Sequence, residues 1–146
     1  MPGHAQSIII ERPLGQVFAY MDDVDLEREW QPHLLEAKQS PPGTTSVGTR
    51  RSYVSEFLGK RIRNTYVVTV YEPEQRVVLE STPDSSVRAK TDIRWEPTED
   101  GTRVTMAMEG KPTGALRLVP RTLLEATFEK EVRATLARLK DRLERG

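Results

Sequence analysis

The chain has 146 residues, the length of one domain, and at this size about two-thirds of the unfolded chain's surface can be buried on folding. It carries 22 basic and 22 acidic residues without a basic stripe, so we expect no nucleic-acid partner. The absence of cysteine excludes disulfides and cysteine-based metal sites and fits a cytoplasmic protein. Neither a membrane-spanning run nor a signal-peptide pattern is present, so we expect no stable membrane insertion.

The first third of the chain alternates between extended and helical patterns. "AQSIIIE" (5–11) is apolar and β-branched, which predicts a strand. "PLGQVFAYMDD" (13–23) starts with a proline, which the first turn of a helix tolerates, and places apolar residues at helical spacing. "DVDLEREWQP" (23–32) predicts a second short helix. "LLEAKQS" (34–40) predicts a short strand, and a loop rich in Pro, Gly, Ser and Thr follows it.

From Val47 onward the hydrophobic period changes to two. Short turn sequences, among them "EDG" at 99–101, separate successive alternating segments. The pattern predicts an antiparallel meander of five consecutive strands with one face in water. These strands cover 47–59, 60–73, 76–82, 87–96 and 102–109.

The predicted strand 60–73 has two chemically different faces. One face carries Ile62, Tyr66, Val68 and Val70. The other face belongs to a charged surface that we predict to be solvated, with basic residues at Arg61, Arg63, Arg88, Lys90 and Arg94. The alternation predicts that the apolar face is buried, and it leaves open whether a solid core or a ligand cavity covers it.

The C-terminal segment predicts one long amphipathic helix. Its apolar stripe follows helical spacing through Leu124, Phe128, Val132, Leu136, Leu139 and Leu143. Pro120 is predicted to start or kink this helix, with "TGALRLVP" (113–120) as an irregular segment before it. The helix stripe and the apolar sheet face must bury each other. The fold class is therefore α+β, a curved antiparallel sheet of about six to seven strands around the helix, as a single domain over 1–146.

This order of elements resembles the START-like superfamily, also called Bet v 1-like or SRPBCC, and within it the polyketide cyclase/dehydrase and lipid-transport group. The resemblance covers nearly the whole chain and rests on strands, turns and the proline before the first helix; none of its motifs is a catalytic signature. The residues that carry it are "IERPLGQVFAYMDD" with Trp30 and Pro32, "VGTRRSY", "FLGKRI", "YVVTVYEPEQRVVLES", "WEPTEDGTRVT" and "LARLKDRLE".

The resemblance implies a helix-grip fold with a cavity between the sheet and the long helix, closed at one end by the two short helices. The implied ligand is a small hydrophobic or amphipathic molecule such as a lipid, a polyketide-like aromatic or an isoprenoid, and no metal or organic cofactor is implied. The wall residues that it implies are Tyr53, Phe57, Tyr66, Val68, Trp95, Met106, Met108, Leu124 and Phe128, with Tyr20 and Trp30 near the short helices.

Polar residues on the predicted inner face are the candidates for chemistry. The alternation through 47–57 turns Arg51, Tyr53 and Ser55 inward, and an inward arginine could hold a carboxylate or a polarised carbonyl. In the alternative interpretation, Arg51 lies at a strand end with its guanidinium in water. Asn64 shares the parity of Tyr66, and its amide is expected to bond Ser55, a ligand or a backbone group.

Three functions fit these observations. The first is binding of a small apolar or amphipathic ligand, by a monomer or homodimer. The second is an enzyme of the cyclase, aromatase or dehydratase type that uses Arg51, Tyr53 and Ser55. The third is a protein-interaction module, which predicts a filled interior and an exposed apolar patch. The only histidines, His4 and His33, do not make a metal site, and we interpret His33 as a surface or rim residue.

Overall fold

The computed structural model describes residues 5–113 and 117–145, so His4 and residues 114–116 of the predicted irregular segment lie outside the described residues. Strand β1 (Gln6–Ile10) precedes helix α1 (Leu14–Asp22), which a single 3-10 turn, η1 (Val24–Leu26), joins to the short helix α2 (Glu27–Trp30). Six strands and the long helix complete the chain: β2 (Leu34–Ser40), β3 (Arg50–Phe57), β4 (Lys60–Glu72), β5 (Arg76–Ser81), β6 (Val87–Pro97), β7 (Thr102–Pro112) and α3 (Arg121–Arg145).

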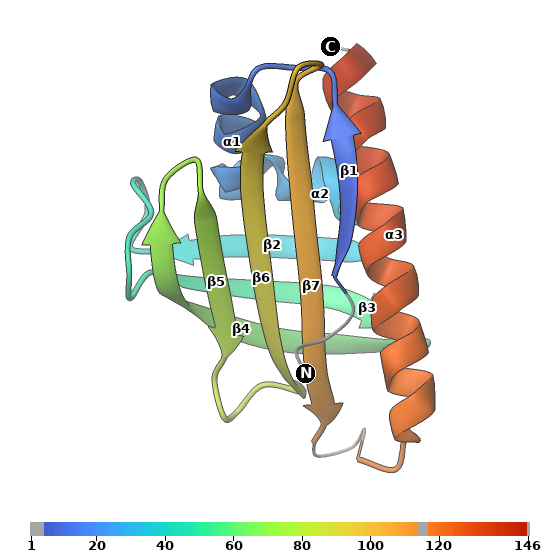
Figure 1. Ribbon diagram of the computed structural model, residues 1–146. Helices are drawn as coiled ribbons and strands as arrows, with labels where there is room; N and C mark the ends of the chain where they lie inside the picture. Colours follow the sequence, from blue (N-terminus) through green and yellow to red (C-terminus); the bar gives the residue numbers. More distant parts are fainter. Residues whose placement is uncertain (1–4, 114–116, 146) are drawn as a thin grey trace.

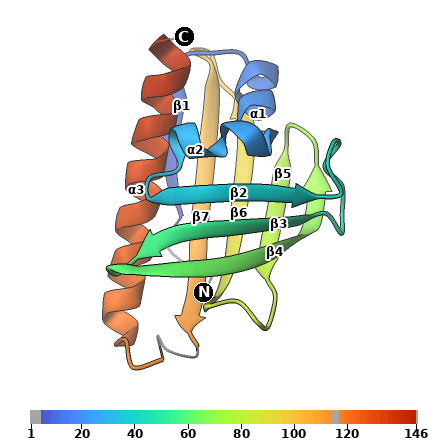
Figure 2. The ribbon, with the colours of Figure 1, turned by 180° about the vertical axis from the view of Figure 1, so that it is seen from behind.

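The seven strands form one antiparallel sheet in the order β1-β7-β6-β5-β4-β3-β2. Strands that follow one another from β2 to β7 are neighbours, and β1 joins the far edge beside β7. The sheet is so strongly curved that β2, β3 and β4 run across the direction of β6 and β7 (Figures 1 and 2). Helix α3 lies along β1 and β7, while α1 and α2 lie at one end of the sheet (Figures 1 and 2). This arrangement confirms the predicted α+β helix-grip fold.

Helix α3 is fastened to β1 by side-chain hydrogen bonds as well as by packing. The Gln6 side-chain amide donates to the Glu129 carbonyl at 2.9 Å, and the Lys140 ammonium donates to the Ile9 carbonyl at 2.7 Å. These bonds place the first strand and the last helix side by side.

The apolar stripe of α3 is buried along its whole length, as predicted. All six residues of the stripe are buried: Leu124, Phe128, Val132, Leu136, Leu139 and Leu143. The last four pack against inward side chains of the sheet and of α1, including Ile10, Val17, Trp95 and Val104. The first two pack in a second cluster with Val87 and Ala89. Burial of each such side chain contributes about 1.5–3 kcal/mol relative to exposure, so packing of this helix on the sheet makes a large contribution to the stability of the fold.

The predicted "EDG" turn joins β6 to β7 and requires glycine at its last position. Gly101 has a φ of 153°, and a Cβ atom on it would lie 2.1 Å from the carbonyl oxygen of Ile10. The turn packs so closely on the end of β1 that a side chain does not fit there.

A β-bulge in β4 corrects the prediction for Val70. The pairing with β5 shifts between Val68 and Val70, so the alternation of inward and outward residues reverses after Val68. Tyr71, paired with Val77, packs against the main core in place of Val70. Simple alternation cannot predict such a reversal, because a bulge adds one unpaired residue to the strand.

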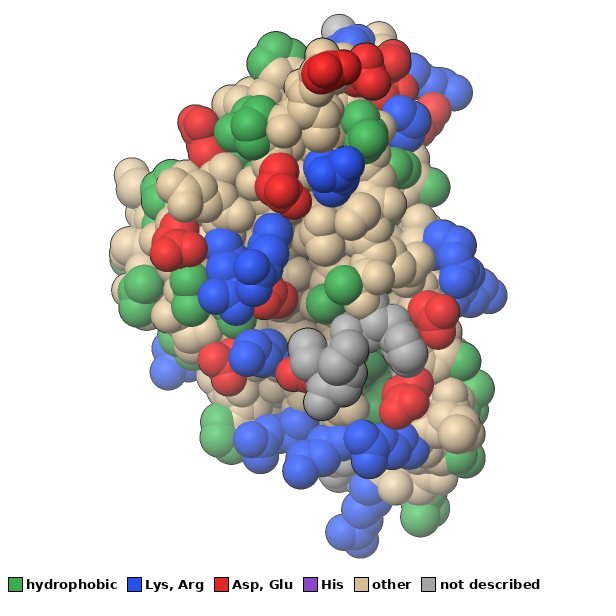
Figure 3. Space-filling model, in the orientation of Figure 1, with side chains coloured by type: hydrophobic (Ala, Val, Ile, Leu, Met, Phe, Trp, Pro, Cys, Tyr) green, Lys and Arg blue, Asp and Glu red, His purple; other side chains and the backbone are tan. Residues whose placement is uncertain are grey.

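The outer face of the sheet carries the predicted charged surface. Acidic and basic side chains are interspersed over this face (Figure 3). The five basic residues of the prediction, Arg61, Arg63, Arg88, Lys90 and Arg94, are all exposed. None of the helices that the structure describes is long and apolar enough to cross a bilayer.

Candidate functional site

A cavity of about 150 Å³ lies inside the curve of the sheet, with α2 and α3 completing its wall. Most of its lining is apolar, and aliphatic side chains such as Ile62, Leu79, Met106 and Met108 contribute to it. Aromatic rings form a large part of the remaining surface: Trp30, Tyr53, Phe57, Tyr66, Trp95 and Phe128.

The inner-face alternation brings most of the residues proposed from the sequence to this cavity. Arg51, Tyr53, Ser55 and Phe57 follow one another along the inner side of β3 and all line it. The other proposed residues that line it are Trp30, Asn64, Tyr66, Trp95, Met106, Met108 and Phe128.

Three proposed wall residues lie elsewhere. Tyr20, on α1, packs its partly buried side chain against the main core, and its hydroxyl donates to Glu29 at 2.9 Å. Val68 is completely buried within the main core, just before the bulge. Leu124 is buried near the start of α3 and packs in a second cluster with Val87. None of these three side chains is among the residues that line the cavity.

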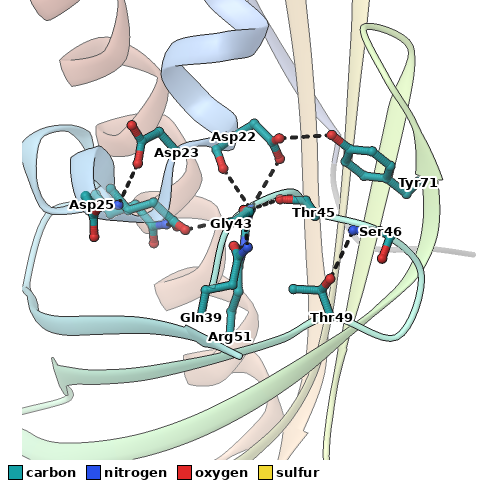
Figure 4. Close-up of polar contacts among 12 residues, drawn as sticks. Asp22, Asp23, Asp25, Gln39, Gly43, Thr45, Ser46, Thr49, Arg51 and Tyr71 are labelled. Atoms are coloured by element: carbon teal, nitrogen blue, oxygen red, sulfur yellow. Dashed lines mark hydrogen bonds and ion pairs between the residues drawn. The ribbon is translucent and has the colours of Figure 1, made fainter. Parts of the chain in front are cut away.

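Arg51 is the centre of a buried polar network at one end of the cavity (Figure 4). The residue is only 4% exposed, which excludes the interpretation that its guanidinium reaches water. The Nε atom donates to Gln39 at 3.0 Å, and one terminal nitrogen donates to Thr45 at 2.9 Å and to the Asp22 carboxylate at 3.2 Å. The other terminal nitrogen donates to Glu27 at 3.4 Å. Each nitrogen of the guanidinium therefore has a protein partner.

The partners of Arg51 come from four different segments. Asp22 ends α1, Glu27 begins α2, Gln39 lies on β2 and Thr45 lies in the loop before β3. One inward arginine on β3 thereby fixes both short helices and that loop against the sheet. Burial opposes the charge of Arg51, but the neighbouring Tyr53, Glu27 and Asp22 outweigh this effect and raise its pKa, so the guanidinium stays charged.

Glu27 is the most unusual titratable group of the site. It is 2% exposed, and the Tyr53 hydroxyl lies 2.9 and 3.0 Å from its two carboxylate oxygens. The Gln31 amide donates to it as well. Burial raises the pKa of Glu27 to about 7, although Arg51 and Tyr53 act in the opposite direction. This direction brings the group closer to the range in which it can exchange a proton at neutral pH.

The sequence analysis missed Glu27, although one signal pointed to it. Glu27 precedes Trp30 by three residues in a helix, so the two side chains share a face. An acid that shares a face with a predicted pocket tryptophan is a candidate for burial. The sequence analysis also missed Asp22, which directly follows the buried Met21. The Asp22 carboxylate accepts a hydrogen bond from the Tyr71 hydroxyl at 2.9 Å. The β4 bulge turns the Tyr71 side chain inward.

The Asn64 side chain bonds backbone groups. The sequence had left three kinds of partner open: Ser55, a ligand or a backbone group. The Asn64 side-chain oxygen accepts from the Val87 amide at 3.1 Å, and its nitrogen donates to the Val87 carbonyl at 2.9 Å. The same nitrogen donates to the Tyr66 hydroxyl at 3.2 Å. The Asn64 amide thus links β4 to the start of β6, beyond the point where β5 ends, and it has no N–H left for a ligand.

The α3 side of the cavity is chemically different. Phe128, Glu131 and Thr135 line it from one face of the helix. The ring of Phe128 lies 5.8 Å from that of Phe57. An oxygen of Glu131 lies 3.4 Å from Nε2 of His33, whose side chain is 56% exposed at the rim. Burial raises the pKa of Glu131, with the nearby His33 acting in the opposite direction.

Several hydroxyl groups of the wall make no hydrogen bond within the described part of the chain. They belong to Ser55, Thr91 and Thr135. The described residues contain no cluster of histidine and acidic side chains that could hold a metal ion. The chemistry available to the cavity thus includes aromatic surface, hydroxyls, the Trp30 N–H, which has no hydrogen-bond partner among the described residues, Glu131 and the Glu27–Tyr53 pair.

A curved antiparallel sheet that grips a helix around a largely apolar cavity is the architecture of the helix-grip class. Residues 1–144 match the family described as polyketide cyclase / dehydrase and lipid transport, and the chain belongs to this family. A search of curated proteins finds no match.

Solved structures share the fold at low sequence identity. A START superfamily protein from Mycobacterium smegmatis has a TM-score of 0.80 and 11% identity, with 97% of both chains covered. The protein TTHA0849 of Thermus thermophilus has a TM-score of 0.79 and 19% identity, with 94% of both chains covered. Ara h 8.0201 has a TM-score of 0.71 and 10% identity, over 98% of this chain and 97% of that one. At these identities the likeness establishes the fold alone.

Proposed function

We propose that the protein binds a compact, largely apolar or amphipathic small molecule in the cavity between the sheet and α3. The observation that carries this proposal is the cavity itself, about 150 Å³ of space lined mainly by aromatic and aliphatic side chains. A close-packed interior contains few voids larger than a water molecule, so a space of this size is a departure from ordinary packing. A few polar groups on the wall orient the ligand, as in most small-molecule sites.

The volume selects the size of the ligand. An apolar cavity of about 150 Å³ accepts a molecule such as benzene, whereas sites for drug-sized ligands measure about 300–1,000 Å³. We therefore expect a ligand of one or two rings, or an isoprenoid of similar size. We expect a long-chain lipid to fit this volume less well.

Binding can be followed by the fluorescence of Trp30 and Trp95, the two tryptophans of the chain, which both line the cavity. Benzyl alcohol, 1-naphthol and palmitate form a series of increasing size. We expect the first to bind, the second to bind more weakly and the third not to bind. If neither ring compound binds at millimolar concentration, the proposal is wrong.

A matched pair of variants on β7 locates the bound ligand. Met108→Ala enlarges the cavity, and we expect it to shift the preference toward 1-naphthol. Arg103→Ala, on the exposed side of the same strand, should leave the size preference unchanged. An identical shift in both variants would place the ligand outside the cavity.

A second candidate function, an enzyme that moves protons on a carbonyl substrate, is favoured by Glu27. This carboxyl group lines the cavity, contacts Tyr53 and has its pKa raised to about 7. Its carboxylate form would take a proton from the carbon beside a carbonyl, and the resulting enolate is the nucleophile of a cyclisation. The cavity does not favour the third alternative, an interaction module, because that function predicts a filled interior.

Exchange of the carbon-bound protons of a small cyclic diketone in D₂O, followed by NMR, tests the second candidate. Removal of a general base typically costs about 10²–10⁴-fold in rate, so Glu27→Gln should lower exchange to the uncatalysed level. Glu29→Gln, in the same helix but exposed, is the matched control. Exchange that is equally fast in Glu27→Gln and the wild type would exclude this role for Glu27.

A further inference from the structure

The wall of the cavity is acidic, and its acidic groups are not equally neutralised. Four acidic residues are among those that line the cavity, Asp22, Glu27, Glu56 and Glu131, of which Glu56 is exposed on the outward side of β3, and Arg51 is the one lysine or arginine among them. Arg51 already bonds Asp22 and Glu27. A ligand carboxylate would therefore meet a surface of its own sign, with no free guanidinium to receive it.

Glu131 is a carboxylate of this wall that makes no ion pair with a lysine or arginine of the described residues, although Lys130, the preceding residue of α3, acts on its charge. Its side chain is 26% exposed, and its ion-pair partner is His33 at the exposed rim, 3.4 Å away. Burial raises the pKa of Glu131, because water solvates its charge only in part. A carboxylate in this position gains from a cation brought by the ligand.

Aromatic rings adjoin Glu131 on the same side of the cavity. Phe128 precedes it by three residues on α3, so both side chains point to one face, and Phe57 packs 5.8 Å from Phe128. The faces of aromatic rings carry partial negative charge and attract organic cations. An apolar amine would place its ring among these side chains and its ammonium group at the Glu131 carboxylate.

Given the proposed binding function, on which this step rests, we propose that the ligand is an organic cation: a compact ring compound with an ammonium group that binds Glu131. A neutral ligand of the same shape fills the same space but brings no cation to Glu131. An anionic ligand of the same shape is repelled by the acidic wall. The affinity of the cavity for ligands of equal size and shape should therefore depend on the charge of the ligand.

Three probes of one shape test the proposal by isothermal titration calorimetry at pH 7: benzylamine, benzyl alcohol and benzoate. The amine and the alcohol are isosteric and differ in charge. An ion pair near the surface together with contact to an aromatic ring gives an expected preference of about tenfold for benzylamine. Benzoate should show no measurable binding.

Variants of α3 place the ammonium group. Glu131→Gln should bind benzyl alcohol as the wild type does and should bring the ratio between amine and alcohol close to one. Glu125→Gln is the matched control, because Glu125 lies on the outside of the same helix, paired with Arg121. It should keep the wild-type ratio.

The outcomes separate this inference from the proposed function. If none of the three probes binds, the binding function itself falls. If benzyl alcohol binds at least as tightly as benzylamine, the organic-cation inference is overturned while the binding function stands. A preference for the amine that survives in Glu131→Gln overturns the assignment of the ammonium group to Glu131.

Discussion

The two ends of the cavity use polar residues in opposite ways. At the end that we call the anchored half (Asp22, Glu27, Arg51 and Tyr53), the polar side chains bond one another. At the end that we call the open half (Ser55, Phe57, Phe128, Glu131 and Thr135), the hydroxyls lack partners within the described residues and the carboxylate has only a rim histidine. Strand β3 runs through both, from Arg51 and Tyr53 to Ser55 and Phe57. Groups that satisfy each other hold the fold, and groups left unsatisfied remain for a ligand.

The largest effect is expected from Arg51→Met, which removes the cation of the anchored half. The buried Glu27 and the partly exposed Asp22 would lose their compensating charge, and breaking a buried ion pair such as Arg51–Glu27 costs about 3–5 kcal/mol. Urea unfolding measures the change in the free energy of unfolding. Arg50→Met, at the exposed neighbouring position, should change it by less than about 0.5 kcal/mol.

The double variant Arg51→Met/Glu27→Met sharpens this test. Because the second substitution removes a charge that the first has stranded, the double variant should lose less stability than the sum of the two single variants. Strict additivity would show that Arg51 and Glu27 do not act as a pair.

The next largest effect is the pH dependence that Glu27 gives to stability. Its pKa is about 7 in the folded protein and 4.5 ordinarily, so the folded state binds the proton more tightly. This contribution to the free energy of unfolding is full below pH 4.5 and is lost as the pH rises to 7. The loss amounts to about 3 kcal/mol. Glu27→Gln should lack it, as urea unfolding from about pH 5 to about pH 8 can measure; parallel curves for the two proteins would contradict the expectation.

Asn64→Ala should have an intermediate effect. The Val87 amide and carbonyl would lose their partners inside the sheet, and an unsatisfied buried group costs about 1–3 kcal/mol. Thermal unfolding measures the loss, and Arg63→Ala, at the exposed position before it, should leave the midpoint nearly unchanged. An equally small change in both variants would mean that the Asn64 bonds do not stabilise the sheet.

The smallest effect on stability is expected from Glu131→Gln. The partly exposed carboxylate has only a 3.4 Å contact with the exposed His33, so the free energy of unfolding should change by less than about 0.5 kcal/mol. The same substitution is expected to abolish the preference for an ammonium ligand. A decrease of several kcal/mol in the free energy of unfolding would show that Glu131 stabilises the fold as the residues of the anchored half do. The proposed difference between the two ends would then be wrong.

Hydrophobic alternation was sufficient to predict the sheet and the inner face of β3. Residues two apart on a strand share a face, so Arg51, Tyr53 and Ser55 followed from parity alone. The stripe of α3 followed from helical spacing in the same way. The bulge at Val68 and Val70 could not be predicted, because it depends on the pairing with β5 and leaves no mark in the composition of β4.

The sequence was less informative about which acids face the cavity. Glu27 and Glu131 each lie three residues from an aromatic residue that was predicted to line the wall, Trp30 and Phe128 respectively. Helical geometry would have placed both acids there, but an acid in an amphipathic helix is ordinarily assigned to solvent. Arg51 neutralises Glu27 and not Glu131. This difference depends on tertiary contacts between residues far apart in the sequence.

The attachment of α3 to β1 has a consequence for biosynthesis. Gln6 bonds Glu129 and Ile9 bonds Lys140, so these contacts join residues that are more than 120 positions apart in the chain. Until α3 has left the ribosome, the concave face of the sheet has no cover and its apolar side chains remain in water. The nascent chain is therefore most vulnerable to aggregation just before its last helix is made.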